Sequence, residues 1–289
     1  METWETGASE LAPGVFAYVQ ATGGLCIANA GLIAGRESAT AVDALFTPSM
    51  TRAFLDEAAR LTPLPVRQLL NTHHHLDHTL GNALFPAGAQ IVAHAKAKAE
   101  MERVGLPLDL LRRFVPHFAP ELDGVSLRLP DRTFDGDGLD VRLDEDGRLL
   151  RLLHFGCGHT KGDVLVHLPE ERVLFAGDVA FFYVTPLAFE GHIGRWIGVC
   201  RRVLDELDVD TIVPGHGPVG GKDELRLMLG YLELVRDGAR RAFDAGAAEE
   251  EAVRAIDLGA YAAWGEADRI VPNVARLYQE FRGELEEFV

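Results

Sequence analysis

Four short apolar segments, each of which reads as a strand, lead directly into a side chain that can bind a metal. VRQLLNT precedes His73, LLRLLHFGCG precedes His159, RVLFAG precedes Asp178 and DTIVPG precedes His216. A sheet is rigid, whereas the loops at its strand ends are free to present side chains, so ligands gather there in open sheet folds. The repeated pattern predicts that these four strand ends meet at one site.

The first 220 residues are divided by glycines and prolines into short apolar runs, with helical patterns between them. From Lys222 to Val289 the pattern is almost entirely helical. Such a mixture predicts an α/β (α+β) fold, with a sheet core and helices outside it. We expect residues 1–221 to form one domain and residues 222–289 to form a C-terminal helical extension packed on it.

Hydrophobic periodicity locates the individual elements. The expected strands are 14–20, 26–35, 40–46, 66–72, 89–94, 149–156, 163–169, 172–178 and 210–215. The expected helices before residue 221 are 48–61, 93–104, 108–115 and 194–207.

Charge and composition exclude several classes of function. The formal net charge of −16 argues against binding to nucleic acid or to anionic membranes. The N-terminus lacks a signal-peptide pattern, and no apolar run reaches the ~18 residues of a membrane span. Cys26, Cys157 and Cys200 are odd in number and far apart, which disfavours a disulfide framework. We expect a cytoplasmic protein and leave a homodimer open.

The stretch LLNTHHHLDHTLGN contains four histidines and one aspartate within six positions. In an extended segment, residues two apart project to the same side, so His73, His75 and Asp77 can converge on one centre or on two adjacent ones, while His74 faces away. His78 begins a predicted short helix and points toward a second centre. Imidazole and carboxylate ligands suit zinc, with iron or manganese as alternatives. Two divalent ions that share a carboxylate need about seven ligand contacts, which five histidines and two aspartates supply.

The run H-x-H-x-D-H, followed by CGHTKGD, LFAGD and PGHG, resembles the metallo-β-lactamase superfamily of metallohydrolases over roughly residues 11–220. The resemblance implies an αββα four-layer sandwich with a dinuclear site at one edge. It implies that the first metal takes His73, His75 and His159, that the second takes Asp77, His78 and His216, and that Asp178 bridges the two. It also implies that Asp43, in TAVDALF, orients a ligand histidine. Thr160 and Asp163 are expected to brace the loop that carries His159.

A dinuclear site of this kind predicts hydrolysis of an acyl bond in a thioester, ester, lactone or amide. Divalent ions lower the pKa of a bound water to about 7 and stabilise the oxyanion that forms at the carbonyl. Asp77 is the candidate acceptor for the proton of that water. The expected partner is therefore a small-molecule or carrier-bound acyl substrate.

The loop after Asp178, VAFFYVTPLAFEGHIGRW, is rich in aromatic residues and has two interpretations. Phe181, Phe182, Tyr183 and Phe189 either fill a core or line a pocket beside the metals. The second interpretation predicts an apolar or aromatic substrate.

Comparison within the superfamily argues against two classes of substrate. True β-lactamases generally have Cys or Ser in the region of Asp178, so antibiotic hydrolysis is not expected as the main activity. Hydroxyacylglutathione hydrolases carry GHTxGH and a basic C-terminal segment. This chain has Asp163 in place of the second histidine and ends in the acidic FRGELEEFV, which argues against a glutathione thioester.

Three alternatives stay open from the sequence. The tract PGVFAYVQATGGLCIANAGLI and the helical tail are similar to cyclases and thioesterases of this fold in aromatic polyketide pathways. A mononuclear iron oxygenase of the persulfide dioxygenase kind shares the first three ligand motifs. A non-enzymatic protein with a structural metal is disfavoured, because a structural zinc site is closed by four protein ligands and this chain offers more.

Overall fold

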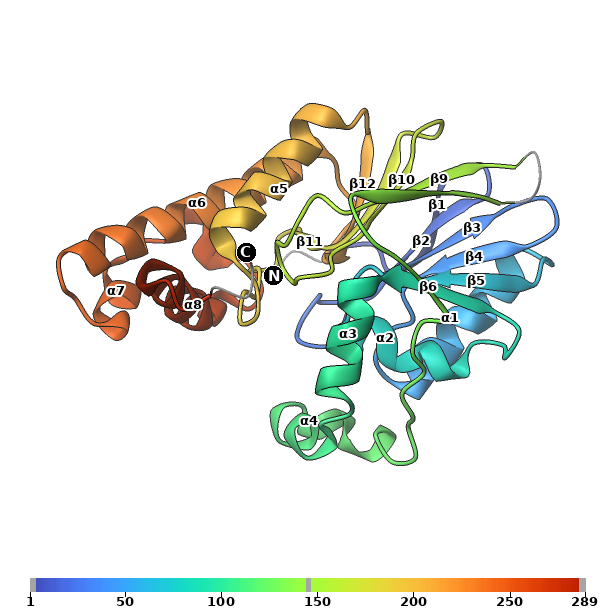
Figure 1. Ribbon diagram of the computed structural model, residues 1–289, viewed down its shortest axis with the longest axis horizontal. Helices are drawn as coiled ribbons and strands as arrows, with labels where there is room; N and C mark the ends of the chain where they lie inside the picture. Colours follow the sequence, from blue (N-terminus) through green and yellow to red (C-terminus); the bar gives the residue numbers. More distant parts are fainter. Residues whose placement is uncertain (1–3, 144–146, 286–289) are drawn as a thin grey trace.

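The computed structural model describes residues 4–143 and 147–285. The ends of the two predicted regions, residues 1–3 and 286–289, lie outside the described residues. Two β-sheets pack face to face, with α1, α2 and α3 on one side and α5 to α8 on the other (Figure 1). This arrangement confirms the predicted αββα four-layer sandwich.

The first sheet has seven strands in chain order, antiparallel from β1 to β4 and parallel from β4 to β7. These strands are β1 Gly7–Ala12, β2 Val15–Val19, β3 Ala30–Ala34, β4 Ala39–Val42, β5 Val66–Leu70, β6 Gln90–His94 and β7 Arg132–Phe134. The second sheet has the order β12-β11-β10-β9-β8, and only β11 and β12 run parallel. Its strands are β8 Gly138–Arg142, β9 Leu149–Leu153, β10 Leu165–Leu168, β11 Val173–Phe181 and β12 Thr211–His216.

The helices lie outside the two sheets or at their ends. The α-helices are α1 Pro48–Leu61, α2 Leu76–Thr79, α3 Ala95–Val104, α4 Leu108–Phe114, α5 Ile193–Glu206, α6 Lys222–Asp244, α7 Glu249–Ala255 and α8 Ile270–Arg282. The 3₁₀ helices are η1 Leu80–Leu84, η2 Pro116–Glu121, η3 Gly259–Ala263 and η4 Ala267–Arg269. Over the described parts of the chain, no helix combines the length and the apolar composition needed to cross a lipid bilayer.

Helix α1 shows how the sequence sets a boundary and a buried face. The hydroxyl of Thr47 accepts a hydrogen bond from the amide of Met50, and Pro48 occupies the first helical position. Both features are favoured at a helix start. Phe54 and Ala58, four residues apart, bury the same face of the helix against the first sheet.

Three apolar layers hold the sandwich together. Between the sheets, Ile33 and Leu70 of the first sheet pack with Val166 and Phe175 of the second. A second layer joins α1 to the outer face of the first sheet. A third layer joins α5, α6 and α8 to the outer face of the second sheet and includes the fully buried Trp196. The division of the chain at residue 221 stays a prediction.

Candidate metal centre

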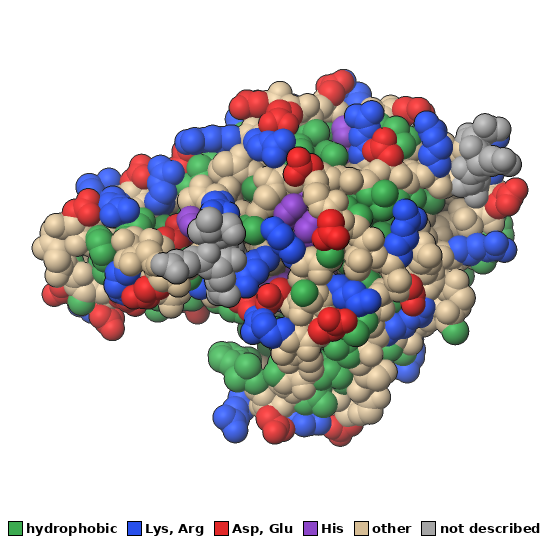
Figure 2. Space-filling view, viewed as in Figure 1, with side chains coloured by type: hydrophobic (Ala, Val, Ile, Leu, Met, Phe, Trp, Pro, Cys, Tyr) green, Lys and Arg blue, Asp and Glu red, His purple; other side chains and the backbone are tan. Residues whose placement is uncertain are grey.

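The four candidate ligands singled out after predicted strands meet at one edge of the sandwich, although β11 continues past Asp178 to Phe181. His73 follows β5, His159 lies between β9 and β10, Asp178 lies within β11, and His216 ends β12. His75 caps α2, which carries Asp77 and His78. Figure 2 shows histidine side chains near the middle of one face, beside Lys and Arg side chains. The site therefore draws residues from both sheets.

Three histidines and Asp178 form a first group whose candidate ligand atoms all lie within 4.8 Å of one another. Nδ1 of His75 lies 2.9 Å from Nε2 of His159. Oδ2 of Asp178 lies 3.2 Å from Nε2 of His159 and 3.9 Å from Nε2 of His73. This group has the membership that the resemblance implies for the first metal, together with its bridging carboxylate.

A second group contains Asp77, His78 and His216 within the same 4.8 Å limit. Oδ2 of Asp77 lies 3.3 Å from Nε2 of His216 and 3.9 Å from Nε2 of His78. Asp178 borders this group as well, because its Oδ1 lies 3.0 Å from Nε2 of His78 and its Oδ2 lies 3.5 Å from Nε2 of His216. Asp178 thus lies between the two groups.

Buried polar atoms without a hydrogen-bond partner test whether these residues fit a cation. Nε2 of His73, Nε2 of His78 and Oδ1 of Asp178 are buried, and within the described chain none of them meets the geometry of a hydrogen bond, although the last two face each other at 3.0 Å. Leaving such atoms unpaired costs free energy. Ligands at 2.0–2.1 Å from a tetrahedral zinc lie about 3.3 Å apart, which is close to the spacings found here. The residues fit a divalent cation.

Hydrogen bonds to the far ring nitrogens aim the histidines inward. Nδ1 of His78 donates to Oδ2 of Asp43, which also accepts from the hydroxyl of Thr72. Nδ1 of His73 lies 3.1 Å from that hydroxyl. Nδ1 of His216 lies 3.1 Å from the carbonyl oxygens of Gly23 and Ile27. Each ring therefore presents Nε2 to the centre, and such fixed orientation is typical of metal-binding histidines.

The protonation states of the candidate ligands favour binding of a cation between them. Burial raises the pKa of Asp178, but nearby His216, His78 and His159 outweigh it and lower that pKa well below its usual value. Burial also lowers the pKa of His159, to about 3. The carboxylate is therefore ionised, while His159 offers a neutral nitrogen.

A family model for the metallo-beta-lactamase superfamily matches residues 23–216. The chain belongs to this superfamily. The match spans all the candidate ligands from His73 to His216 and ends before α6.

Several characterised members of the superfamily are similar in sequence. The alpha subunit of 2,4-dinitroanisole O-demethylase from Nocardioides sp. (strain JS1661) is 32% identical over 64% of this chain and 51% of its own length. The acyl-coenzyme A thioesterase MBLAC2 of Bos taurus is 29% identical over 63% of this chain and 66% of its own. A hydroxyacylglutathione hydrolase from Rhizobium meliloti (strain 1021) is 28% identical over 64% and 59%. The chain thus matches about half to two-thirds of the length of these relatives.

Solved structures of the superfamily share the fold at low sequence identity. The sec-alkylsulfatase Pisa1 from Pseudomonas sp. superposes with a TM-score of 0.73 at 21% identity, covering 96% of this chain and 50% of its own. The DIM-1 metallo-beta-lactamase superposes with a TM-score of 0.62 at 19% identity, covering 80% of this chain and 99% of its own.

The backbone of the H-x-H-x-D-H run differs from the sequence expectation at one point. His73, His75 and Asp77 were expected to lie on one extended segment and to converge on one centre or on two adjacent ones. The segment instead turns into α2 at Leu76, so Asp77 belongs to the first helical turn. That turn places Asp77 with His78 and His216, apart from His73 and His75.

Asp163 holds the loop on both sides of His159. Its carboxylate accepts hydrogen bonds from the amide of Gly158 and from the amide and hydroxyl of Thr160. Burial raises the pKa of Asp163 to about 7, and the hydrogen bonds from Thr160 act in the opposite direction. The bracing role of Thr160 and Asp163 stays a prediction, for which these contacts supply the geometry.

The four aromatic residues proposed for substrate contact divide into buried and exposed groups. Phe181 and Phe182 are each 1% exposed and pack in the third apolar layer. The ring of Phe181 also stacks on His216, with centroids 5.0 Å apart. Tyr183 is partly buried against the same layer. Phe189 is 49% exposed and stacks on His75 at 5.1 Å, so it alone of the four combines exposure with a ligand ring.

Sequence reasoning missed Glu190, which follows Phe189 in the aromatic loop. Its Oε2 lies 3.0 Å from Nε2 of His74 and 2.9 Å from Nε2 of His75. No motif marks this carboxylate, because it reaches the histidines from more than 100 residues away in the chain. His74, expected to face away from the centre, points at Glu190.

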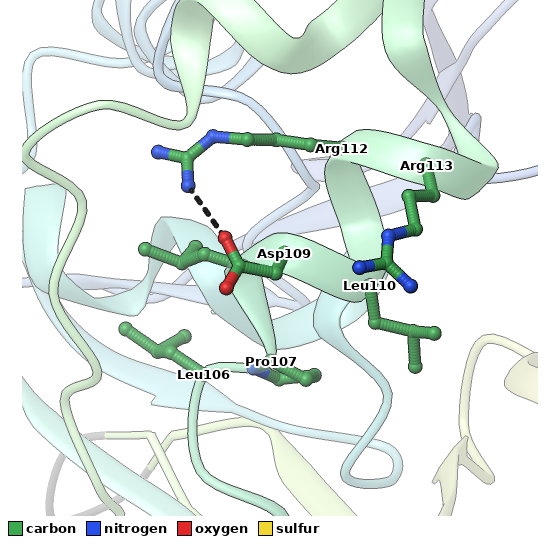
Figure 3. A pocket seen from close by; sticks show the side chains of 7 residues that line it. Leu106, Pro107, Asp109, Leu110, Arg112 and Arg113 are labelled. Carbon is green, nitrogen blue, oxygen red and sulfur yellow. Dashed lines mark hydrogen bonds and ion pairs between the residues drawn. The ribbon is translucent and has the colours of Figure 1, made fainter.

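A further pocket lies away from the centre, and none of the candidate ligands lines it. It has a volume of about 590 Å³ and is lined by residues of the segment 106–113, which covers most of α4 and the two residues before it (Figure 3). Asp109 and Arg112 form an ion pair across it at 3.4 Å. A second cavity of about 170 Å³ adjoins the metal centre, and His74 and Glu190 are among its lining residues.

Proposed function

We propose that this chain is a metal-dependent hydrolase that uses a dinuclear, zinc-loaded site to attack an acyl bond with water. The substrate class is a thioester, ester or lactone of a small or carrier-bound molecule. One observation carries the proposal: five imidazoles and two carboxylates converge, and several buried ligand atoms among them form no hydrogen bond with the described residues.

Each residue has a part in the proposed reaction. Bound divalent ions would ionise water near neutral pH and polarise the scissile carbonyl. Asp77, with a side chain 14% exposed, lies at the rim of the second group and accepts a proton from water in the site. Asp178 belongs to the first ligand group, borders the second and would hold the two together. Asp43 holds His78 in the orientation that binding requires.

Two relatives support the acyl bond. One is a thioesterase by name and one a hydroxyacylglutathione hydrolase. The exposed ring of Phe189 beside His75 supports an apolar or aromatic group next to the carbonyl. An aromatic polyketide cyclase/thioesterase activity has the same support and is the first alternative.

An aryl methyl ether is a second candidate substrate, because one relative, 32% identical over 64% of this chain, is the alpha subunit of a 2,4-dinitroanisole O-demethylase. The persulfide dioxygenase alternative differs in its metal, since it needs one iron and consumes oxygen. Identifying the bound metal as zinc or iron therefore distinguishes the hydrolytic proposals from the oxidative one.

Metal quantification of the purified chain, combined with a hydrolysis screen, tests the proposal. The screen contains acyl-coenzyme A thioesters, acyl-carrier thioesters, aryl esters, lactones and 2,4-dinitroanisole. We expect two zinc ions per chain and turnover of at least one acyl substrate that is lost on chelation. One iron per chain with oxygen uptake, or turnover of dinitroanisole alone, would overturn the acyl-hydrolase assignment.

A cytoplasmic location is part of the proposal. Cys26, Cys157 and Cys200 are free and buried, which suits a reducing compartment. The oligomeric state, monomer or homodimer, is measured by light scattering on the same preparation.

A further inference from the structure

We propose that Glu190 is the positioning residue for the ligand His75, and that helix α8 holds Glu190 in place through Arg276. The inference rests on the metal centre proposed above. It adds a carboxylate that lies outside the ligand set, and a function for the C-terminal helices.

His75 presents a different ring nitrogen to the centre from the other oriented histidines. Its Nδ1 faces Nε2 of His159 at 2.9 Å, while its Nε2 donates to Oε2 of Glu190 at 2.9 Å. Because Nε2 carries the proton, Nδ1 keeps the lone pair that a cation needs. Glu190 therefore does for His75 what Asp43 does for His78.

The Glu190 carboxylate is itself held from two sides. The same Oε2 accepts a second hydrogen bond from Nε2 of His74 at 3.0 Å, and Arg103 lies 3.7 Å from Oε1. An ionised carboxylate raises the basicity of the imidazole it binds and so strengthens the ligand.

Helix α8 forms hydrogen bonds with the backbone of the loop that carries Glu190. Nη2 of Arg276 donates to the carbonyl of Glu190 at 2.7 Å, and Nε of Arg276 donates to the carbonyl of Gly191 at 2.5 Å. One turn further along α8, Glu280 accepts from the amides of Ile193 and Gly194 at the start of α5. Two successive turns of α8 thus anchor residues 190–194.

The contacts form a continuous path from α8 to the centre. Arg276 sets the backbone of residues 190 and 191, Glu190 sets His75, and His75 belongs to the first ligand group with His73 and His159. Partners that orient a ligand histidine in this way affect metal affinity by about 10–100-fold. Removing either the Arg276 contact or the Glu190 contact should therefore lower the affinity of the first group for its metal ion. The affinity of the second group should stay the same.

Zinc titration against a chromophoric chelator, without substrate, tests the proposal. In Glu190→Ala we expect one of the two zinc dissociation constants to rise about 10–100-fold, with the other changing less than about 3-fold. Glu190→Gln keeps an acceptor oxygen without the charge and should fall between wild type and Ala. Arg276→Met should weaken the same zinc by a smaller factor, and Arg276→Lys should restore part of it.

A second readout distinguishes positioning from general loosening. Cobalt substituted for zinc should show altered absorption bands in Glu190→Ala, because the geometry at His75 changes. Arg201→Met is the matched control: it removes a surface contact between α5 and Glu233 of α6 without touching residues 190–194. It should leave both zinc constants and the cobalt spectrum unchanged.

The outcomes separate the two parts of the inference. Two wild-type-like zinc constants in Glu190→Ala overturn the role of Glu190. A weakened zinc in Glu190→Ala with unchanged constants in Arg276→Met overturns the link to α8. A wild-type chain that binds no zinc at all refutes the proposed function, and this inference with it, before any variant is compared.

Discussion

The carboxylate of Asp43 joins a candidate metal ligand to the end of β5. Its Oδ2 lies 2.7 Å from Nδ1 of His78 and 2.7 Å from the hydroxyl of Thr72, and its Oδ1 accepts from the amide of Thr72. One buried side chain thereby couples the second ligand group to the loop that begins the first.

Replacing Asp43 by Asn tests this coupling. The backbone φ of Asp43 is +60°, a conformation that Asn tolerates as well as Asp does, so the fold should be kept. The amide lacks the charge that strengthens the bond from His78, and zinc affinity should fall about 10–100-fold. Zinc titration measures the effect, circular dichroism checks the fold, and wild-type affinity would contradict the role.

Asp178→Ala should remove at least one metal equivalent and most of the turnover. The carboxylate lies within 3.5 Å of candidate ligand atoms in both groups, so no other described side chain bridges them in the same way. We expect a loss of turnover on the order of 100-fold or more. Full occupancy by elemental analysis together with full rate would exclude the bridging role.

Gly215→Ala should disturb the centre through sterics alone. A Cβ at this position would lie 1.8 Å from Oδ1 of Asp178, so the carboxylate has to move. Metal occupancy and melting temperature should both fall. Gly198→Ala is the control, because its Cβ meets no atom within 4 Å and Ala in a helix is favoured over Gly by about 1 kcal/mol.

The raised pKa of Glu280 predicts that the free energy of unfolding depends on pH. Burial raises its pKa from 4.5 to about 7, although hydrogen bonds from Gly194 and Ile193 oppose the shift. Between those two values the folded chain keeps a proton that the unfolded chain has released. The contribution to stability is therefore present at pH 4.5 and below and is lost as the pH rises to 7.

Glu280→Gln removes that titration and should be more stable than wild type at pH 8 by up to about 3 kcal/mol. At pH 4.5 the two chains should be nearly equal. Urea unfolding of the metal-free chains at several pH values between 4 and 8 measures the difference. A difference independent of pH would show that Glu280 does not titrate in this range.

Phe189→Ala should change substrate binding without changing stability. The ring is 49% exposed, and losing its contact with an aromatic acyl group should raise KM by up to about 10-fold, equivalent to about 1.4 kcal/mol. Phe181→Ala gives the contrast, because that ring is buried and its removal should cost about 3–5 kcal/mol of unfolding free energy. Steady-state kinetics and thermal melting separate the two effects.

The strands that the sequence predicted are those with a buried face. Three strands, β1, β7 and β8, were not predicted, and each lies at the edge of its sheet. An edge strand is paired on one side only and can carry polar residues, as GASELA in β1 does. Periodicity therefore gives little signal for these strands. Helix α1 was predicted with the boundaries it has in the structure, because Thr47 and Pro48 mark its start.

The candidate ligands could be predicted because each lies in a short motif at or after a strand. Most of the residues that orient these ligands could not be predicted. Glu190 and Arg276 lie far from the ligands in sequence and belong to no motif. Their roles follow from how α8 packs beside residues 190–194. Such long-range placement depends on the packing of the whole C-terminal region and leaves no local pattern.

The candidate ligands are divided between the two sheets of the sandwich, with His73 at the end of β5 in one and Asp178 in β11 of the other. A cation shared by both sides resists any sliding of one sheet over the other. Removal of the ion should then speed amide hydrogen exchange along β5 and β11, even where no ligand residue is nearby. An ion bound for the activation of water would then also hold the two sheets in a fixed position relative to each other.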